Sequence, residues 1–372
     1  MKKKALTLIL AFCMVISLLP GLSVRADAAW DGSASTALSV VDITLPYNAD
    51  TNPLAISSAA DLKYLSQIVN ADGDVVYTDS GGSENTTEAE YASYRQTADI
   101  ALNEGYTFPA PDGTTGLVTV KKGSDTVCCL GMGMGSATID GTGSQTPAAG
   151  TYYYDSGGGN YRTYTDISEA QESEGYYIYT SDSLVYIYNN RSVPELGGGA
   201  SYMLNVWIPI NSSSSTFDGY IYFDGGGNAV SGVYINSDLY DQGLFGSVEY
   251  LSVENVGIEN SYIRGNSAVG SILGYAYGIL ENCYNTGSVC GNQAIGGIAG
   301  SFRGRDGYST RIESCYNTGS VSGVEKVGGV AGYASSFSNI QKCYNTGSVS
   351  GQQYIGGMVG SIYSRVNMQN CY

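Results

Sequence analysis

The sequence CYNTGSV at residues 283–289 recurs twice, and its first two residues recur once more, with copies that begin at Cys283, Cys315, Cys343 and Cys371. A second motif lies between these copies as AIGGIAG, KVGGVAG and YIGGMVG, which begin at Ala294, Lys326 and Tyr354. The CYNTGSV copies start 32, 28 and 28 residues apart. Because a fixed period signals a repeat architecture, we expect one structural unit for every copy.

Each repeat alternates short apolar runs with glycines and Asn-Thr-Gly turns, where we expect glycine to adopt positive φ. These runs are too short for helices, and one repeat cannot bury its own apolar face. Two or three short strands per coil, stacked about 4.8 Å apart, would make a parallel β-helix. The sequence therefore predicts a mostly β fold: a parallel β-helix or β-solenoid with an N-terminal capping helix and a Tyr-rich β insertion. The insertion FRGRDGYST before Cys315 is expected to form a surface loop.

Stacked coils would place identical residues of successive repeats above one another. We expect a structural ladder of Cys283, Cys315, Cys343, Cys371, Asn285, Asn317 and Asn345. In-register stacking keeps the Cβ vectors of the cysteines parallel, whereas a disulfide needs them to converge. We therefore favour buried free thiols over disulfides for this ladder.

Composition excludes several classes of function. The 372 residues include 51 Gly and 33 Tyr but no His, and the formal net charge is −17. Without histidine, neither a Ser-His-Asp triad nor an H-E-x-x-H zinc site can form. The acidic balance disfavours nucleic-acid binding. Nothing in the sequence indicates a cofactor or a metal site.

The first residues indicate export. Three lysines precede a fifteen-residue apolar stretch, and Ala26-Asp27-Ala28 has the small-residue pattern of a signal-peptidase site. We predict a signal peptide over residues 1–28 and no membrane span in the mature chain. The expected location is secreted or extracellular, with possible cell-wall attachment through a region beyond residue 372, where the chain stops in mid-repeat.

The mature chain divides into three predicted regions. Residues 29–103 form an N-terminal segment with a capping helix over 58–70 and the first strands. Ser58 and Asp61 form a candidate capping box, and Leu62, Leu65 and Val69 share one helical face. Residues 104–206 are a Tyr/Gly-rich insertion, and residues 207–372 are the solenoid, which we expect to be truncated.

The insertion contains two runs typical of paired strands, YYIY at 176–179 and LVYIY at 184–188. The tyrosines on these runs pack on a β face or form an exposed platform for sugar or protein. The candidate binding residues are Tyr176, Tyr177, Tyr179, Tyr186 and Tyr188.

Paired carboxylates could supply the acid and base of a glycosidase. The candidates are Asp140, Asp218 and Asp224, each followed by glycine. Because Asp-Gly is also a turn signature, solvated turn carboxylates are the favoured interpretation.

The pattern CYNTGSVSG followed by VGGVAG resembles the GLUG motif of secreted bacterial proteins. The resemblance extends upstream through AISSAADLKYLSQIVN (55–70), TADIAL (97–102), WIPI (207–210) and GLFG (243–246), so it covers 55–103 and 207–372. It implies a β-solenoid in a surface or secreted protein, with adhesin-like members. The motif also occurs in IgA-specific metallopeptidases, whose zinc motif is absent from this sequence.

These observations favour a non-enzymatic function. We expect a secreted or cell-surface, adhesin-like or structural module whose rigid surface binds a glycan or a host or cell-surface protein. Two enzymatic alternatives stay open. The β-helix could itself be a polysaccharide lyase or glycoside hydrolase, or the chain could be the non-catalytic front part of a larger surface metallopeptidase.

Overall fold

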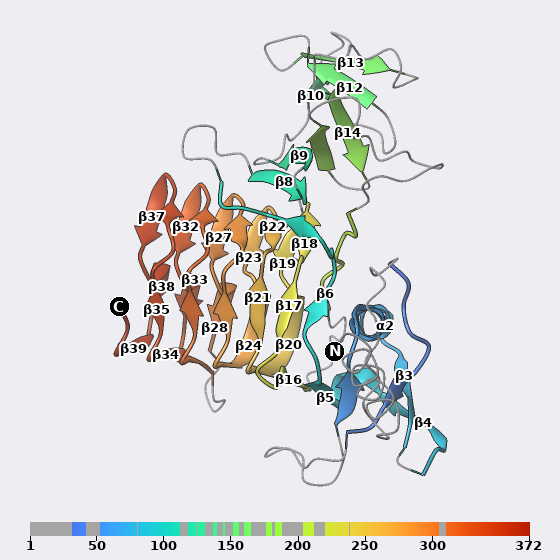
Figure 1. The fold of residues 1–372 in the computed structure, drawn as a ribbon. Helices are drawn as coiled ribbons and strands as arrows, with labels where there is room; N and C mark the ends of the chain where they lie inside the picture. Colours follow the sequence, from blue (N-terminus) through green and yellow to red (C-terminus); the bar gives the residue numbers. More distant parts are fainter. Residues whose placement is uncertain are drawn as a thin grey trace, which may run out of the picture.

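The computed structural model is mostly β and is dominated by a parallel β-solenoid (Figure 1). The structure describes residues 32–41, 53–79, 81–111, 118–123, 125–130, 137–139, 144–145, 152–155, 160–164, 176–180, 183–187, 204–211, 220–237, 239–304 and 310–372. The predicted signal peptide, residues 1–28, lies outside these ranges. No helix among the described residues is both long and apolar enough to cross a membrane.

Four parallel sheets form the walls of the solenoid, and each coil from β16 to β37 contributes a strand to every wall. Sheet I consists of β2 (Leu54–Ile56), β5 (Ser93–Gln96), β16 (Ile221–Asp224), β20 (Phe245–Glu254), β24 (Leu273–Glu281), β28 (Ala299–Arg303), β29 (Arg311–Glu313), β33 (Ala331–Ser335), β34 (Asn339–Gln341), β38 (Val359–Tyr363) and β39 (Asn367–Gln369). Sheet II consists of β6 (Ile100–Ala101), β17 (Ala229–Ser231), β21 (Gly257–Glu259), β25 (Tyr284–Asn285), β30 (Tyr316–Asn317) and β35 (Tyr344–Asn345).

The other two walls contain five strands each. Sheet III consists of β18 (Tyr234–Asn236), β22 (Tyr262–Arg264), β26 (Ser288–Cys290), β31 (Val321–Ser322) and β36 (Val349–Ser350). Sheet IV consists of β19 (Tyr240–Gln242), β23 (Ser267–Val269), β27 (Gln293–Gly296), β32 (Glu325–Gly328) and β37 (Gln353–Gly356). The expected two or three strands per coil was therefore too few, because two residues suffice to turn the chain from one short strand to the next, as between β24 and β25 or β25 and β26.

The repeats stack in register, as the sequence predicts. Tyr284 pairs with Tyr316, and Tyr316 pairs with Tyr344. The insertion before Cys315 falls between β28 and β29, which both pair with the continuous strand β24 of the preceding coil. It therefore lengthens one coil without shifting the register of the next.

Branched side chains of the GG motif fill the interior. Ile295, Ile298, Val327 and Val330 are completely buried in one continuous core. They point inward because side chains alternate across each strand, and the glycines between them take up little room at the corner.

The expected role of the Asn-Thr-Gly glycines was wrong. Gly287, Gly319 and Gly347 are not in the left-handed region, which non-glycine residues just before the cysteines occupy instead: Asn282, Ser314 and Lys342 have φ of 53–54°. Glycine is required for a steric reason. A Cβ on Gly319 would lie 1.9 Å from the carbonyl oxygen of Gly287 in the preceding coil.

The predicted capping helix is α2 (Ala59–Asn70), and Ser58 is its N-cap, whose hydroxyl accepts from the Asp61 amide at 3.2 Å. Leu62, Leu65 and Val69 are completely buried. A hydrogen bond also joins the helix to the segment at 207–211, because the Ser66 hydroxyl donates to the Ile208 carbonyl at 2.8 Å. That segment pairs with the first coils through Val206–Tyr234 and Ile210–Phe245 bridges, so α2 covers the N-terminal end of the stack (Figure 1).

Short elements next to α2 complete the N-terminal segment. They are β1 (Leu38–Ser39), β3 (Asp74–Thr78), β4 (Glu84–Glu88) and the 3-10 helix η1 (Ala89–Tyr91). Strands β1, β3 and β4 form a small sheet of their own.

The insertion leaves the solenoid between sheet II and sheet III of a single coil. After β6 the chain departs at Asn103 and returns at Asn205. The Asn103 side chain binds the backbone of Asn205: Asn205 N donates to Asn103 Oδ1 at 2.7 Å, and Asn103 Nδ2 donates to the Asn205 carbonyl at 3.0 Å. The Asn205 side chain donates to the Leu102 carbonyl at 3.2 Å. The neck is thus closed by side-chain amides, and the coil continues as if uninterrupted.

The strands of the insertion form a separate nine-stranded sheet beside the solenoid (Figure 1). They are β7 (Tyr106–Thr107), β8 (Val118–Lys122), β9 (Asp125–Leu130), β10 (Ala137–Ile139), β11 (Ser144–Gln145), β12 (Tyr152–Asp155), β13 (Asn160–Tyr164), β14 (Tyr176–Thr180) and β15 (Ser183–Ile187). The predicted strand pair is confirmed, because β14 and β15 pair antiparallel from Tyr176–Ile187 to Thr180–Ser183.

Glycine-to-alanine substitutions test the stacking directly. A Cβ on Gly329 would lie 2.2 Å from the Gly357 carbonyl oxygen and 2.3 Å from Asn345 Cγ, whereas nothing lies within 4 Å of a Cβ on the equivalent Gly357. We expect Gly329→Ala to lower the free energy of unfolding by about 1–3 kcal/mol, the usual cost of overpacking. Gly357→Ala should leave it unchanged or raise it slightly. Equal effects in chemical denaturation would contradict the described register.

Candidate functional site

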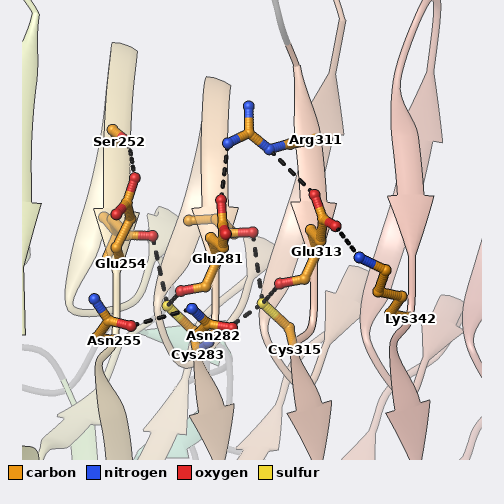
Figure 2. A network of polar contacts seen from close by, with 12 residues as sticks. Ser252, Glu254, Asn255, Glu281, Asn282, Cys283, Arg311, Glu313, Cys315 and Lys342 are labelled. Carbon is orange, nitrogen blue, oxygen red and sulfur yellow. Dashed lines mark hydrogen bonds and ion pairs between the residues drawn. The ribbon is translucent and has the colours of Figure 1, made fainter. Parts of the chain in front are cut away.

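A ladder of carboxylates runs along one edge of the solenoid, where sheet I ends and the chain turns into sheet II (Figure 2). Asp224 pairs with Glu254, Glu254 with Glu281, and Glu281 with Glu313. Gln341 and then Gln369 continue the row. The final residues of β16, β20, β24 and β29 are in register, so stacking brings four acidic side chains into one line.

Cations compensate the charge at both ends of this row. Arg95 forms an ion pair with Asp224 at one end. At the other, Arg311 lies 2.8 Å from Glu281 and 3.4 Å from Glu313, and Lys342 lies 2.8 Å from Glu313 (Figure 2). Glu254, in the middle, binds only neutral donors, the Tyr222 hydroxyl at 3.1 Å and the Ser252 hydroxyl at 3.5 Å.

The pKa values of these carboxyl groups follow their surroundings. Burial raises the pKa of Glu254, and the neighbouring Glu281 charge adds to the effect. The hydrogen bond from Lys342 lowers the pKa of Glu313. The cost of ionisation therefore differs along the row: the negative charge is disfavoured at Glu254 and favoured at Glu313.

The predicted cysteine ladder lies just beyond this corner. Cys283, Cys315 and Cys343 are completely buried, and Cys371 is half-buried. Each thiol donates to the carbonyl two residues before it, at 3.1–3.3 Å, and to one in the preceding coil (Figure 2). Burial raises the pKa of the Cys315 thiol well above its usual range. The stacked arrangement is confirmed, and the free-thiol state stays a prediction.

The predicted asparagine ladder is inside the solenoid, on sheet II. Asn285 Nδ2 donates to Asn317 Oδ1 at 2.7 Å, and Asn317 Nδ2 donates to Asn345 Oδ1 at 2.8 Å. Each amide also donates to the glycine carbonyl two residues later, at 2.9–3.1 Å. These bonds satisfy side chains that would otherwise be costly to bury.

Tyrosines form a third row on the outer side of the same sheet. The ring centroids of Tyr284 and Tyr316 are 5.1 Å apart, those of Tyr316 and Tyr344 are 4.9 Å apart, and those of Tyr344 and Tyr372 are 5.5 Å apart. The planes of adjacent rings differ by 2–10°, so each ring covers its neighbour's face. The row ends at Glu259, which accepts a 2.6 Å hydrogen bond from the Tyr284 hydroxyl.

This geometry limits what the tyrosine stack can bind. Sugars pack on aromatic faces, and here the faces of the inner rings are already covered, leaving edges and hydroxyls exposed. The stack is consequently better suited to holding coils together than to receiving a flat ligand.

The three candidate catalytic carboxylates are not brought together by the described structure. Asp224 is almost fully buried and pairs with Arg95, while its other oxygen accepts from the Gly226 amide at 2.9 Å and from Asn255 at 3.0 Å. These contacts assign Asp224 to the turn and to the start of the carboxylate row. Asp140 and Asp218 lie outside the described residues.

The candidate binding tyrosines of the insertion fall on the confirmed strand pair. Tyr176, Tyr177 and Tyr179 are on β14 and Tyr186 is on β15, whereas Tyr188 lies outside the described residues. Their role in binding stays a prediction. Within the described ranges, no group of three or more His, Cys, Asp or Glu side chains could hold a metal ion.

Sequence reasoning missed the carboxylate row. Its signal was present, because Glu281, Glu313 and Gln341 each stand two residues before a repeated cysteine. Stacking of the repeated tyrosines follows from the repeat, but sequence reasoning did not predict that they form a row on the outer surface. Only the ring geometry shows that the faces of the inner rings are covered.

Removing the central amide of the asparagine ladder should destabilise the stack. We expect Asn317→Ala to lower the free energy of unfolding by about 1–3 kcal/mol. The substitution removes the acceptor of Asn285 Nδ2 and a donor to Asn345 Oδ1. Thr318→Ala, at the exposed neighbouring position, is the matched control and should have little effect. Equal denaturation midpoints for both variants would show that the amides contribute nothing.

The carboxylate row predicts opposite pH dependences for two glutamates. The raised pKa of Glu254 means that its ionisation opposes folding, so Glu254→Gln should stabilise the protein at pH 7, and the gain should vanish below about pH 4. The lowered pKa of Glu313 contributes stability above its unfolded pKa, which is lost as the pH falls through the folded value.

Glu313→Gln should consequently destabilise the protein at pH 7 and match the unsubstituted chain in acid. Each change is expected to stay below about 1 kcal/mol, since both groups reach solvent. Thermal melts at pH 3.5 and pH 7 measure both variants. A destabilising Glu254→Gln at pH 7 would refute the assigned charge pattern.

Comparisons with known proteins agree with the repeat. The model of the GLUG motif matches residues 265–289 and 323–350. Halomucin of Haloquadratum walsbyi is 38% identical over 80 residues, which are 21% of this chain and 1% of halomucin. The chain thus spans only about 1% of the length of this curated relative.

A solved structure is also similar, a candidate immunoglobulin A1 protease from Bacteroides ovatus. It has a TM-score of 0.46 and 18% sequence identity, covering 87% of this chain and 75% of that one. The two GLUG-motif matches fall on coils whose stacked ladders the structure shows, so the chain contains GLUG-motif repeats.

Proposed function

We propose that the chain is a non-enzymatic, secreted or cell-surface module, adhesin-like in its use, that presents a rigid solenoid to a glycan or protein partner. The observation that carries this proposal is the unbroken stacking of one tyrosine from each of four successive coils, at 4.9–5.5 Å. The same coils carry the asparagine and cysteine ladders, so three sets of side chains reinforce one axis.

Rigidity suits display. Neighbouring coils exchange backbone hydrogen bonds, as from Tyr316 N to the Cys283 carbonyl of the preceding coil at 3.0 Å and from Tyr344 N to the Cys315 carbonyl at 3.1 Å. A stack of this kind deforms little when load is applied along it, and insertions can leave a coil without disturbing its neighbours. The nine-stranded insertion and the outer faces of the walls are the surfaces offered to a partner.

The contacts of Asp224 support a structural over a catalytic interpretation. A catalytic carboxylate must be free to reach a substrate, whereas both oxygens of Asp224 are held by groups of the chain. The sequence features typical of a signal peptide support the proposed export. Attachment to a cell wall is part of the proposal.

A paired binding and turnover assay tests the proposal. The secreted chain is applied to an array of neutral and charged glycans, mucin and matrix proteins, and the same ligands are incubated with it in solution. We expect saturable binding to at least one ligand and no release of reducing ends or peptides. Turnover of any ligand, or failure to bind every ligand, would contradict the proposal.

A further inference from the structure

A row of alternating tyrosine and serine residues crosses the outer face of sheet I. The paired positions on successive coils are Ser247, Tyr275, Ser301, Tyr333 and Ser361. Strands β24, β28 and β33, which carry the central three, lie side by side (Figure 1). The tyrosines are two coils apart, about 9.6 Å at the usual strand spacing.

This doubled spacing distinguishes the row from the tyrosine stack on sheet II. There each ring covers the next, whereas here a small serine separates the rings. The small Ser301 side chain consequently leaves room between the rings for the side chain of Arg303, which lies on the same strand. The neighbouring positions on the far sides are serines, Ser247 and Ser361. Tyr277 lies edge-on to Tyr275 with centroids 5.8 Å apart, and Lys326 Nζ lies 5.9 Å from the centroid of Tyr333.

Arg303 occupies the space between the two rings. Its Cζ lies 5.3 Å from the centroid of Tyr275 and 5.8 Å from the centroid of Tyr333. Stacking on ring faces uses the plane of a guanidinium and leaves its N–H groups, which point along the edge, free for hydrogen bonds. The tyrosines thus hold an exposed guanidinium in a fixed orientation, which reduces the entropy lost on binding.

The charge of Arg303 is also available to an anionic ligand. Arg311 and Lys342 pair with the carboxylate row, and Lys326 pairs with Glu325 at 2.9 Å, but no described carboxylate forms an ion pair with Arg303. Residues 282–372 contain six basic and three acidic residues and so have a formal charge of +3. The rest of the chain has a formal charge of −20, which gives the total of −17. At physiological salt, charges farther than about 8–10 Å away are largely screened.

We propose that this face of sheet I binds an anionic sugar unit of a glycan. The exposed Arg303 guanidinium receives the carboxylate or sulfate, and the accessible parts of the half-buried Tyr275 and Tyr333 rings contact the sugar ring. The inference rests on the proposed binding function and names its partner chemistry and its place on the solenoid.

Hydroxyl groups around Arg303 favour a sugar over an acidic peptide. The Tyr275 hydroxyl donates to the Tyr277 hydroxyl at 3.0 Å, and these groups, with the half-buried Ser247 and Ser361, are donors and acceptors that match sugar hydroxyls. Aromatic faces two coils apart suit a chain of rings better than an extended peptide, for which this continuous wall offers no free strand edge.

Titrations with defined polymers test the site. Polygalacturonate carries carboxylates and dextran sulfate carries sulfates, while fully methyl-esterified pectin and plain dextran are their neutral counterparts, all measured in 0.15 M NaCl. We expect binding to one or both anionic polymers and none to the neutral ones. Arg303→Gln should weaken binding at least about tenfold, as the loss of a charged hydrogen-bonded pair does.

Two further variants separate stacking from charge. Arg303→Lys keeps the charge but loses the planar contact and should recover only part of the affinity. Tyr333→Ser, which repeats the residue of the neighbouring coils, should weaken binding several-fold. Arg311→Gln is the matched control, since Arg311 is already paired with Glu281 and Glu313, and it should bind like the unsubstituted chain. Unchanged melting temperatures confirm folding.

Three results would overturn the inference: equal binding of charged and neutral polymers, unchanged affinity of Arg303→Gln, or equal binding of poly-glutamate, which would indicate an acidic protein partner. Each leaves the proposed function intact if the array shows other ligands. Failure to bind anything on the array would instead refute the proposed function itself.

Discussion

Stacking of each coil on the one before it, at the spacing of hydrogen-bonded strands, is the constraint on which the rest of the molecule depends. At this spacing the backbones of neighbouring coils meet at the corners, and only glycine fits where they touch. Gly319 faces the Gly287 carbonyl and Gly329 faces the Gly357 carbonyl at distances that no Cβ tolerates. The glycines of the repeat are therefore explained by contact between coils and not by turn conformation.

The same constraint turns every repeated residue into a ladder, with a benefit or a cost set by its chemistry. Stacked asparagines satisfy one another in the interior, and stacked tyrosines gain ring contact on the outside. Stacked glutamates repel, and the chain offsets this with Arg95, Arg311 and Lys342 before the row becomes neutral at Gln341. Alternation of tyrosine with serine breaks the pattern and leaves room for Arg303.

Much of this could be predicted from the repeat alone. The parallel solenoid, its capping helix and the Cys and Asn ladders follow from the period and from the capping pattern at Ser58. The number of strands per coil did not, because corners made by one left-handed residue such as Asn282 have no clear sequence signal. The position of Arg303 between Tyr275 and Tyr333 was also missed, because these tyrosines repeat every second coil and a search for a one-coil period does not detect them. The roles of Asp140, Asp218 and the insertion tyrosines stay predictions.

A double-mutant cycle on the asparagine ladder tests in-register stacking most directly. Asn285, Asn317 and Asn345 are replaced by alanine singly and in pairs, and the free energy of unfolding is measured by chemical denaturation. The account predicts a coupling of about 0.5–3 kcal/mol between Asn285 and Asn317, which touch, and nearly additive effects for Asn285 and Asn345, which are two coils apart. Additive effects for the first pair, or equal coupling in both, would contradict the stacking on which every ladder depends.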